Sequence, residues 1–119
     1  MTVSERRASP RVPAYRPVRV HQPTAPRVIE SLTKNLSEGG VRCLSPAMIP
    51  VSTPLTVDIV LSNSHDTFTV TGKAVWFRVI PHSDQFDVGI AFSELSNQNK
   101  RRLSVYIADL STKAHLIPA

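Results

Sequence analysis

Alternating apolar and polar positions predict a series of short strands between residues 28 and 92. In residues 55–61, Leu55, Val57, Ile59 and Leu61 fall on one face of an extended chain. Similar runs occupy residues 28–32, 41–44, 68–79 and 86–92. Short strands joined by tight turns, with no helix between them, favour an antiparallel barrel over a parallel sheet.

The longest run, residues 68–79, raises the question of where its tryptophan points. Strict alternation puts Phe68, Val70, Ala74 and Trp76 on one face, so we expect Trp76 to lie in the core. Gly72 interrupts the run and predicts a bulge or bend at that position.

One amphipathic helix is predicted after the strands, over residues 96–112. Ser96 is a suitable N-cap residue. Four apolar residues follow at helical spacing and form one stripe: Leu103, Tyr106, Ile107 and Leu110. We expect the stripe to pack across one end of the barrel, with a partner subunit as the alternative.

Residues 1–27 differ from the rest because they are rich in proline and arginine. Five prolines exclude a stable helix and any central strand, so at most residues 18–20 form a short edge strand. The sequence therefore predicts three parts. These are a flexible basic leader (1–27), a barrel with its helix (28–112) and a tail (113–119).

The positive charge of the chain is concentrated in this leader. The formal net charge is +5, and residues 1–27 hold six arginines, one acid and no lysine. The remaining residues carry equal numbers of basic and acidic side chains. Such a block is either a solvated tail or an anion-binding arm. Arginine suits the second role because its planar guanidinium binds phosphate with two parallel hydrogen bonds and stacks on flat rings.

A short polar segment, residues 35–40, connects the first two strands. Asn35 and Ser37 suit a hairpin turn because their side chains bond the local backbone, and Gly39 and Gly40 tolerate a positive φ. The same groups could bind a ligand, since Ser37 and Asn35 offer donors and acceptors beside uncovered glycine backbone. Pattern alone leaves both interpretations open.

The sequence contains no recognisable catalytic or metal site. Its four histidines are far apart and there is a single cysteine, which excludes zinc-ligand spacing. Cys43 is expected to be a buried packing residue, and Asp84 and Asp87 to be solvated. No phosphate loop, dinucleotide fingerprint or nucleophile elbow is present, so we predict that the chain is not an enzyme.

The sequence also allows a prediction of the cellular compartment. No apolar run approaches the roughly 20 residues that span a bilayer, and no apolar segment follows the basic N-terminus as in a secretory signal. Together with the lone cysteine, this predicts a cytoplasmic protein without a membrane span.

Two motifs together indicate a family. Residues 7–11, from Arg7 to Arg11, fit RxxxR, and residues 35–40 fit [D/N]xSxxG with Gly40 in the last position. A strand with Trp76, the strand 88–92 and a closing helix follow. The chain resembles the PilZ domain, a bacterial receptor for cyclic di-GMP, from about Arg6 to about residue 110. The resemblance implies a mainly β fold, a six-stranded antiparallel β-barrel with one C-terminal α-helix.

The resemblance also implies how the ligand is held. Arg7 and Arg11 should bind phosphate oxygens and the edge of one guanine, because a guanidinium matches guanine O6 and N7. Asn35 and Ser37 should hydrogen-bond the other guanine. Asn35 stands where many members have Asp, and it can accept only through its amide oxygen, which predicts somewhat weaker binding.

Four further residues complete the implied site. Gly40, and Gly39 by position, should keep the floor of the site open. Arg6 is expected to stack on a guanine or hold an extra phosphate, which would favour two stacked ligand molecules over one. Trp76 is a candidate ligand contact if it is not in the core.

The resulting hypothesis is a cyclic di-GMP receptor in which binding orders the leader against the barrel and creates a surface for an unidentified downstream protein. No cofactor or metal is implied. One alternative is a PilZ-like interaction module that binds no nucleotide. Another is a small barrel for single-stranded nucleic acid. A neutral barrel with only 6% aromatic residues argues against this last alternative.

Overall fold

The computed structural model of the chain describes residues 12–13, 15–23, 28–61, 67–93 and 95–116. The strands are β1 (Val12–Pro13), β2 (Pro17–His21), β3 (Val28–Ser37), β4 (Gly40–Ser45), β5 (Pro54–Val60), β6 (Thr67–Val79) and β7 (Phe86–Phe92). One helix, α1 (Asn97–Leu116), follows them.

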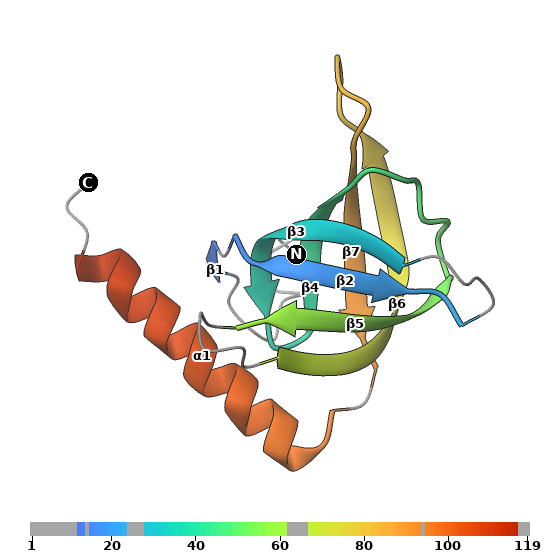
Figure 1. The fold of residues 1–119 in the computed structure, drawn as a ribbon. Helices are drawn as coiled ribbons and strands as arrows, with labels where there is room; N and C mark the ends of the chain where they lie inside the picture. Colours follow the sequence, from blue (N-terminus) through green and yellow to red (C-terminus); the bar gives the residue numbers. More distant parts are fainter. Residues whose placement is uncertain (1–11, 14, 24–27, 62–66, 94, 117–119) are drawn as a thin grey trace, which may run out of the picture.

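Six of these strands form a closed antiparallel barrel (Figure 1). Neighbouring strands run in the order β3-β2-β5-β6-β7-β4, and an additional β3–β4 pairing closes the ring. The two-residue strand β1 adds to the edge of β3. The predicted six-stranded barrel with one C-terminal helix is therefore confirmed.

The core lies inside the barrel and follows the alternation seen in the sequence. Leu55, Val57, Ile59 and Leu61 are all buried, as predicted from their shared face. Phe68 of the neighbouring strand β6 and Ile90 of β7 belong to the same buried cluster. Within the closed ring every strand has a neighbour on both sides, so inward apolar side chains from all six strands share one interior.

Strand β2 corrects the expectation that residues 1–27 contain no central strand. It pairs with β3 on one side and β5 on the other, so that Arg19 lies between Glu30 and Asp58. The prolines permit this because Pro17 is the first residue of β2 and Pro23 lies beyond its end, where no ladder N–H is needed. The barrel thus begins inside the segment that composition marks as a leader.

Strand β6 contains a bulge, but at Val75 rather than at Gly72. Ala74 pairs with Ile90 and Trp76 with Gly89, which leaves Val75 as the extra residue. The extra residue reverses the alternation, so Trp76 turns to the outer face and is 38% exposed. The expectation that Trp76 belongs to the core is therefore wrong.

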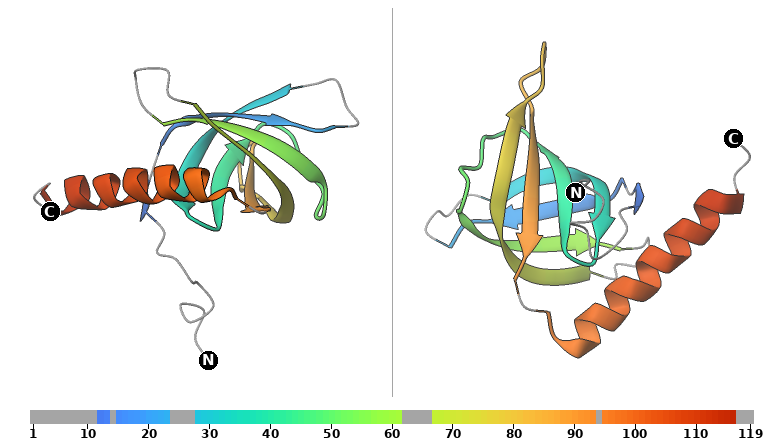
Figure 2. Two further views of the ribbon diagram at one scale, coloured as in Figure 1. Left: turned by 90° about the horizontal axis from the view of Figure 1, so that it is seen from below. Right: turned by 180° about the vertical axis from the view of Figure 1, so that it is seen from behind.

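Beyond the bulge, β6 continues outside the closed ring, where β7 is its one partner among the described strands, while β7 stays paired with β4 as far as Phe86 (Figures 1 and 2). Residues 75–79 of β6 are all exposed, whereas the preceding residues of the strand alternate between buried and exposed. We call the projecting part, residues 75–86, the β6–β7 arm.

Helix α1 begins as predicted and ends later than predicted. The Ser96 hydroxyl accepts a hydrogen bond from the N–H of Asn99 at 3.1 Å, as an N-cap does. Leu103 and Ile107 are buried against the chain's own barrel, which confirms intramolecular packing. The helix continues past residue 112, and its C-terminal part runs beyond the strands (Figure 2). Among the described residues, no helix is long and apolar enough to cross a membrane.

Candidate ligand-binding site

One row of outward positions crosses four adjacent strands. Asn35 of β3 pairs with Arg42 of β4, Arg42 pairs with Gly89 of β7, and Gly89 pairs with Trp76 of β6. Two residues predicted for the site, Asn35 and Trp76, are thus brought onto the same outer face. We call this surface of β3, β4, β7 and β6 the outer face.

A second bulge, in β3, adds a positively charged residue to the outer face. The β3–β4 register shifts between Thr33 and Asn35, so Lys34 is the extra residue. Thr33 stays buried, while the Lys34 side chain reaches Asp87 on β7, with 3.4 Å between Nζ and Oδ1. Because of the bulge, the consecutive residues Lys34 and Asn35 both lie on the outer face.

Asp87 lies at the centre of a cluster of cations on this face. Its side chain is only 3% exposed, and its Oδ2 lies 2.7 Å from Arg42 Nη2 and 2.9 Å from Arg78 Nη2. Lys34 pairs with the other oxygen. The prediction that Asp87 is solvated is therefore wrong, since the carboxylate is enclosed by its three partners.

The electrostatics of the cluster follow from this geometry. Burial alone would raise the pKa of Asp87, but the hydrogen bonds from Arg42 and Arg78 and the charge of Lys34 outweigh it and lower the pKa to about 2. The carboxylate therefore stays ionised at neutral pH. Three cationic side chains against one carboxylate leave an excess of two positive charges on the outer face.

Trp76 forms an aromatic platform beside this charge. Its indole lies over Gly89, where an added Cβ would overlap the ring nitrogen. The guanidinium carbon of Arg42 is 6.0 Å from the ring centroid, within the range of a cation–π contact. The Nε–H of Arg42 is buried and has no hydrogen-bond partner within the described residues.

The Ser37–Gly40 turn has a clear structural role. Ser37 is 4% exposed, and its hydroxyl accepts from the N–H of Gly39 at 3.2 Å and lies 3.4 Å from the Gly40 carbonyl, to which it donates. The hairpin interpretation is therefore correct for the backbone. Ligand contacts by Ser37 and Gly39 stay predictions.

Gly39 and Gly40 differ in how tightly the structure constrains them, and neither is needed for a positive φ. No glycine of the chain has a positive φ. A Cβ on Gly40 would overlap the carbonyl oxygen of Ile90, so this glycine permits the close approach of β4 and β7, and its role in a ligand site stays a prediction. Gly39 is exposed, and its Cβ would meet only the Ser37 hydroxyl at 3.9 Å.

The N-terminal segment reaches this region next to Asn35. Val12 pairs with Leu36 and Pro13 with Asn35. Further along, Arg16 is fixed to β3, because its N–H donates to Thr33 Oγ1 at 2.8 Å and its carbonyl accepts from the N–H of Thr33 at 2.8 Å. Three predicted site residues, Arg6, Arg7 and Arg11, lie outside the described residues.

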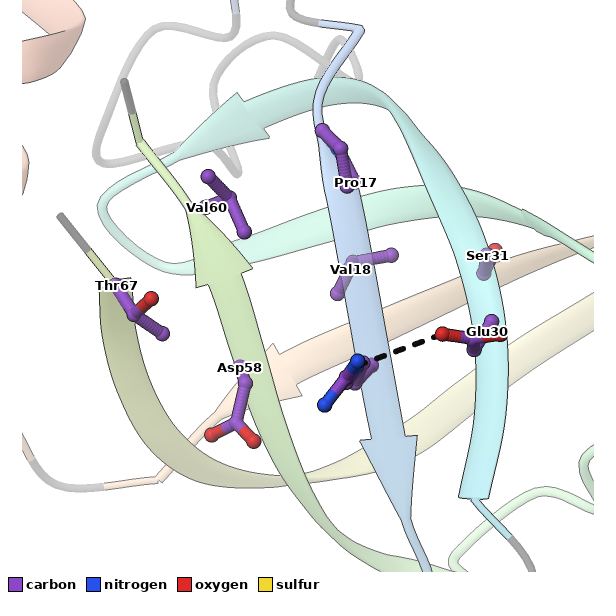
Figure 3. A pocket seen from close by; sticks show the side chains of 8 residues that line it. Pro17, Val18, Glu30, Ser31, Asp58, Val60 and Thr67 are labelled. Carbon is purple, nitrogen blue, oxygen red and sulfur yellow. Dashed lines mark ion pairs between the residues drawn. The ribbon is translucent and has the colours of Figure 1, made fainter. Parts of the chain in front are cut away.

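A separate groove of about 320 Å³ lies on the outside of β2, β3 and β5 (Figure 3). Its charged residues are Arg19, Glu30 and Asp58, and Arg19 Nε pairs with Glu30 at 3.5 Å. One cation against two carboxylates disfavours an anionic ligand. None of the predicted ligand-site residues that the structure describes lines this groove.

The described part of the chain gives no support for metal binding or for a reactive thiol. It contains no group of three or more His, Cys, Asp or Glu side chains that could hold a metal ion. Cys43 is buried as predicted, and burial raises the pKa of its thiol to about 11, so the sulfur stays protonated.

Sequence reasoning missed four residues of the outer face, namely Lys34, Arg42, Arg78 and Asp87. Each stands at a polar position within or beside a predicted strand, which is the one feature that could have pointed to them. Their proximity depends on which strands pair and in what register, and on the two bulges.

Comparison with known proteins agrees with this architecture. The family model of the PilZ domain matches residues 5–109. No curated protein matches the chain. Among solved structures, the PilZ domain with c-di-GMP of YcgR from Escherichia coli has a TM-score of 0.74 at 17% identity, covering 92% of this chain and 94% of that one.

Two longer structures are similar in the same way. The K. pneumonia MrkH–c-di-GMP complex gives a TM-score of 0.80 at 16% identity, covering 92% of this chain and 54% of that one. The Bacillus subtilis inhibitor of motility MotI/DgrA gives 0.77 at 19% identity, covering 91% and 52%. The chain thus spans about half the length of these two proteins. At such identities the likeness shows the fold, and the family match decides membership: the chain belongs to the PilZ domain family.

Proposed function

We propose that this protein is a receptor for cyclic di-GMP that binds the nucleotide on the outer face, between Asn35 and Trp76. The observation that carries the proposal is the row Asn35–Arg42–Gly89–Trp76, which places a hydrogen-bonding amide, a guanidinium and an aromatic ring on one surface. The YcgR and MrkH structures similar to this chain contain c-di-GMP.

Charge supports this choice of ligand. Cyclic di-GMP is a dianion with two phosphates, and the cluster around Asp87 has an excess of two positive charges. Asp87 holds the guanidinium groups of Arg42 and Arg78 in place before any ligand arrives, which lowers the entropy lost on binding. The buried Nε–H of Arg42 is a donor that a ligand oxygen would satisfy.

The aromatic platform supports the nucleobase part of the ligand. Trp76 is half-exposed over Gly89, so a guanine can stack on its free surface. Base–aromatic stacking is worth about 1–3 kcal/mol in other nucleotide complexes. Asn35, at the other end of the row, would hydrogen-bond the second guanine.

The motif arginines are connected to this site through the chain itself. Arg11 directly precedes Val12, which pairs with β3 beside Asn35. Four extended residues span about 13 Å, so Arg7 and Arg11 can engage different parts of one ligand. Arg6 would add a guanidinium for a second, stacked ligand molecule.

In this mechanism, neutralisation of the arginines by the phosphates orders residues 1–11 over the outer face. The covered face is then a new surface for a downstream protein, and the chain works as a cytoplasmic signalling module rather than as an enzyme. The competing hypothesis is a PilZ-like module that interacts with proteins and binds no nucleotide.

Nuclear magnetic resonance tests the location of the site. On addition of cyclic di-GMP, the amide signals of Asn35, Gly39 and Gly89 should shift, and those of Arg19 and Asp58 in the separate groove should not. Shifts confined to the groove, or no shifts at millimolar ligand, would contradict the proposal.

A salt series separates the nucleotide from single-stranded nucleic acid. Affinity for an oligonucleotide falls steeply with salt as counterions are released from many phosphates. Cyclic di-GMP has only two phosphates, so its affinity should change much less between low and physiological salt. Tight oligonucleotide binding with the steep slope would favour the nucleic-acid alternative.

A further inference from the structure

The β6–β7 arm carries a sheet edge that the barrel does not close. Strand β5 pairs with β6 only as far as Lys73, and the loop before β5 bonds Ala74, whose carbonyl accepts from the N–H of Ser52 at 2.7 Å. From Val75 to Val79, the only strand paired with β6 among the described residues is β7. Figure 1 shows this part of β6 standing outside the barrel.

The alternation of hydrogen-bonded pairs between β6 and β7 shows which backbone groups of β6 point toward the free edge. The N–H of Ile80 donates to the carbonyl of Gln85 at 3.3 Å, so this opposed pair is a hydrogen-bonded one. Antiparallel pairs alternate, which makes Arg78 and Trp76 the next residues bonded to β7. Phe77 and Val79 therefore direct their N–H and C=O groups toward the free edge.

The side chains along this edge are unusually apolar for an exposed segment. Val75, Phe77 and Val79 are 41%, 38% and 58% exposed. Edge strands of stable monomers are commonly protected by charged residues or proline, and exposed apolar edges are pairing sites. Phe77 and Val79 lie on the face opposite Trp76 and Arg78, so the edge has one apolar and one cation–aromatic side.

We propose that this edge is a dimerisation site, at which β6 of a second copy pairs antiparallel about a two-fold axis through Phe77. Residues then pair at equal distances on either side of Phe77. Val75 lies opposite Val79 of the second copy, Phe77 opposite its own equivalent, and Trp76 opposite Arg78.

The self-complementarity of this register is the reason for choosing a second copy as the occupant. A two-fold interface requires each patch to match itself. Here exposed valine lies opposite exposed valine, and phenylalanine lies opposite phenylalanine. On the other side, Trp76 and Arg78 lean toward β7 of their own chain, over Gly89 and onto Asp87, and so leave the paired edge clear.

Neighbouring registers fit less well. A two-fold axis through Val79 would put Phe77 opposite Pro81, which has no N–H to donate. An axis through Val75 would put Phe77 opposite Lys73, whose backbone is already paired with Pro54 of β5. The register centred on Phe77 avoids both obstacles and pairs the outward N–H and C=O groups of Phe77 with those of its own equivalent.

This dimer goes beyond the proposed function and does not depend on nucleotide. Strand pairing extends the sheet in its own plane, so it leaves the outer face uncovered. The test therefore uses the full-length protein without ligand, and loss of nucleotide binding would leave its outcome unchanged.

Sedimentation velocity over a concentration series tests the association. The wild type should shift from monomer to dimer, and Val79→Lys should weaken dimerisation by about tenfold or more, because it places a charge within the apolar pairs. Val105→Lys is the matched control, since Val105 is 65% exposed on the helix and should leave the dimer intact. A wild type that stays monomeric up to about 1 mM, or equal effects of the two lysines, would overturn the proposal.

Disulfide cross-linking tests the register. Paired residues of a hydrogen-bonded antiparallel pair have Cα atoms about 5.5 Å apart, which a disulfide can span. The F77C variant should link to itself on mild oxidation, and native Cys43 should not interfere because it is buried. V75C and V79C should link when mixed and much less alone. Equal linking of V105C, or absence of the F77C link in a folded protein, would contradict the register.

Discussion

Trp76 lies over Gly89 on the neighbouring strand, and the glycine is what allows the indole to occupy that position. The two residues are directly opposed in the β6–β7 pairing, and a Cβ on residue 89 would overlap the ring nitrogen and carbon Cε2. Gly89 of β7 thus determines how closely the Trp76 indole of β6 can approach the sheet. This relationship allows the platform to be displaced without changing Trp76 itself.

Gly89→Ala should weaken cyclic di-GMP binding by about tenfold or more while the barrel stays folded. The methyl group has to displace the partly exposed indole, which costs the stacking surface rather than core packing. Val105→Ala is the control, because Val105 is 65% exposed on α1, which contributes no residue to the proposed site. Titration calorimetry with thermal melts checks both variants. Unchanged affinity in a folded Gly89→Ala protein would remove Trp76 from the site.

Trp76→Ala should reduce affinity for cyclic di-GMP by about ten- to a hundredfold, the range expected for one stacked base. Trp76 is the only tryptophan of the chain, so ligand binding to the wild type should also change the protein's tryptophan emission.

Phe77→Ala provides the control for this substitution, since Phe77 is equally exposed, at 38%, but lies on the opposite face of the arm. It should retain wild-type affinity. If the two variants lose affinity equally, the loss reflects damage to the arm and not a missing stacking contact.

Asp87 should make the protein's stability depend on acid. Its pKa is lowered from 3.8 to about 2 in the folded chain, so its ion pairs stabilise the fold fully above pH 4 and are lost as the pH falls from 4 toward 2. The shift corresponds to roughly 2 kcal/mol of unfolding free energy. Chemical denaturation at several pH values measures this dependence.

The comparison for that experiment is Asp87→Asn, which should be less stable than the wild type at pH 7, with the difference shrinking below pH 4. Asp84→Asn is the control because Asp84 lies in the exposed turn at the tip of the arm. A stability difference for Asp87→Asn that is the same at pH 7 and pH 2.5 would contradict the electrostatic role.

Gly40→Ala should destabilise the barrel strongly, whereas Gly39→Ala should not. The obstacle at Gly40 is the backbone carbonyl of Ile90, which cannot move without disturbing the β4–β7 pairing. Overpacking of this kind typically costs about 1–3 kcal/mol. Thermal and urea denaturation decide the matter, and equal stability of the two variants would refute the argument.

The sequence predicted the barrel well because alternation is a local property. Residues such as Val57 and Ile59 are buried because every second position of a strand faces the interior, and no knowledge of the neighbouring strands is needed. The Ser96 cap is equally local. Strand β2 escapes a prediction from proline density because Pro17 is its first residue and Pro23 lies beyond its end, where proline does not interrupt the ladder.

The site was predictable only in part, because it depends on pairing and register. Asn35 was found through its motif, but its position in one row with Trp76 depends on three strand pairings. A single extra residue, Val75, moves Trp76 from the core to the outer face. In the sequence, Asp87 is an ordinary acid near the start of a strand. Its ion pairs arise because strand pairing brings Arg42 of β4 and Arg78 of β6 beside it.

The most direct test of the receptor account is a calorimetric titration of cyclic di-GMP into the wild type and into Arg11→Ala. Arg11 belongs to the leader motif and directly precedes the segment that pairs beside Asn35. A charge-assisted arginine bond is worth about 1.5–3 kcal/mol. We predict saturable, micromolar or tighter binding to the wild type, at one or two ligands per chain, and a loss of about one to two decades in the variant. Absence of binding to a folded wild-type sample at moderate salt would contradict the account and favour a PilZ module that acts through proteins alone.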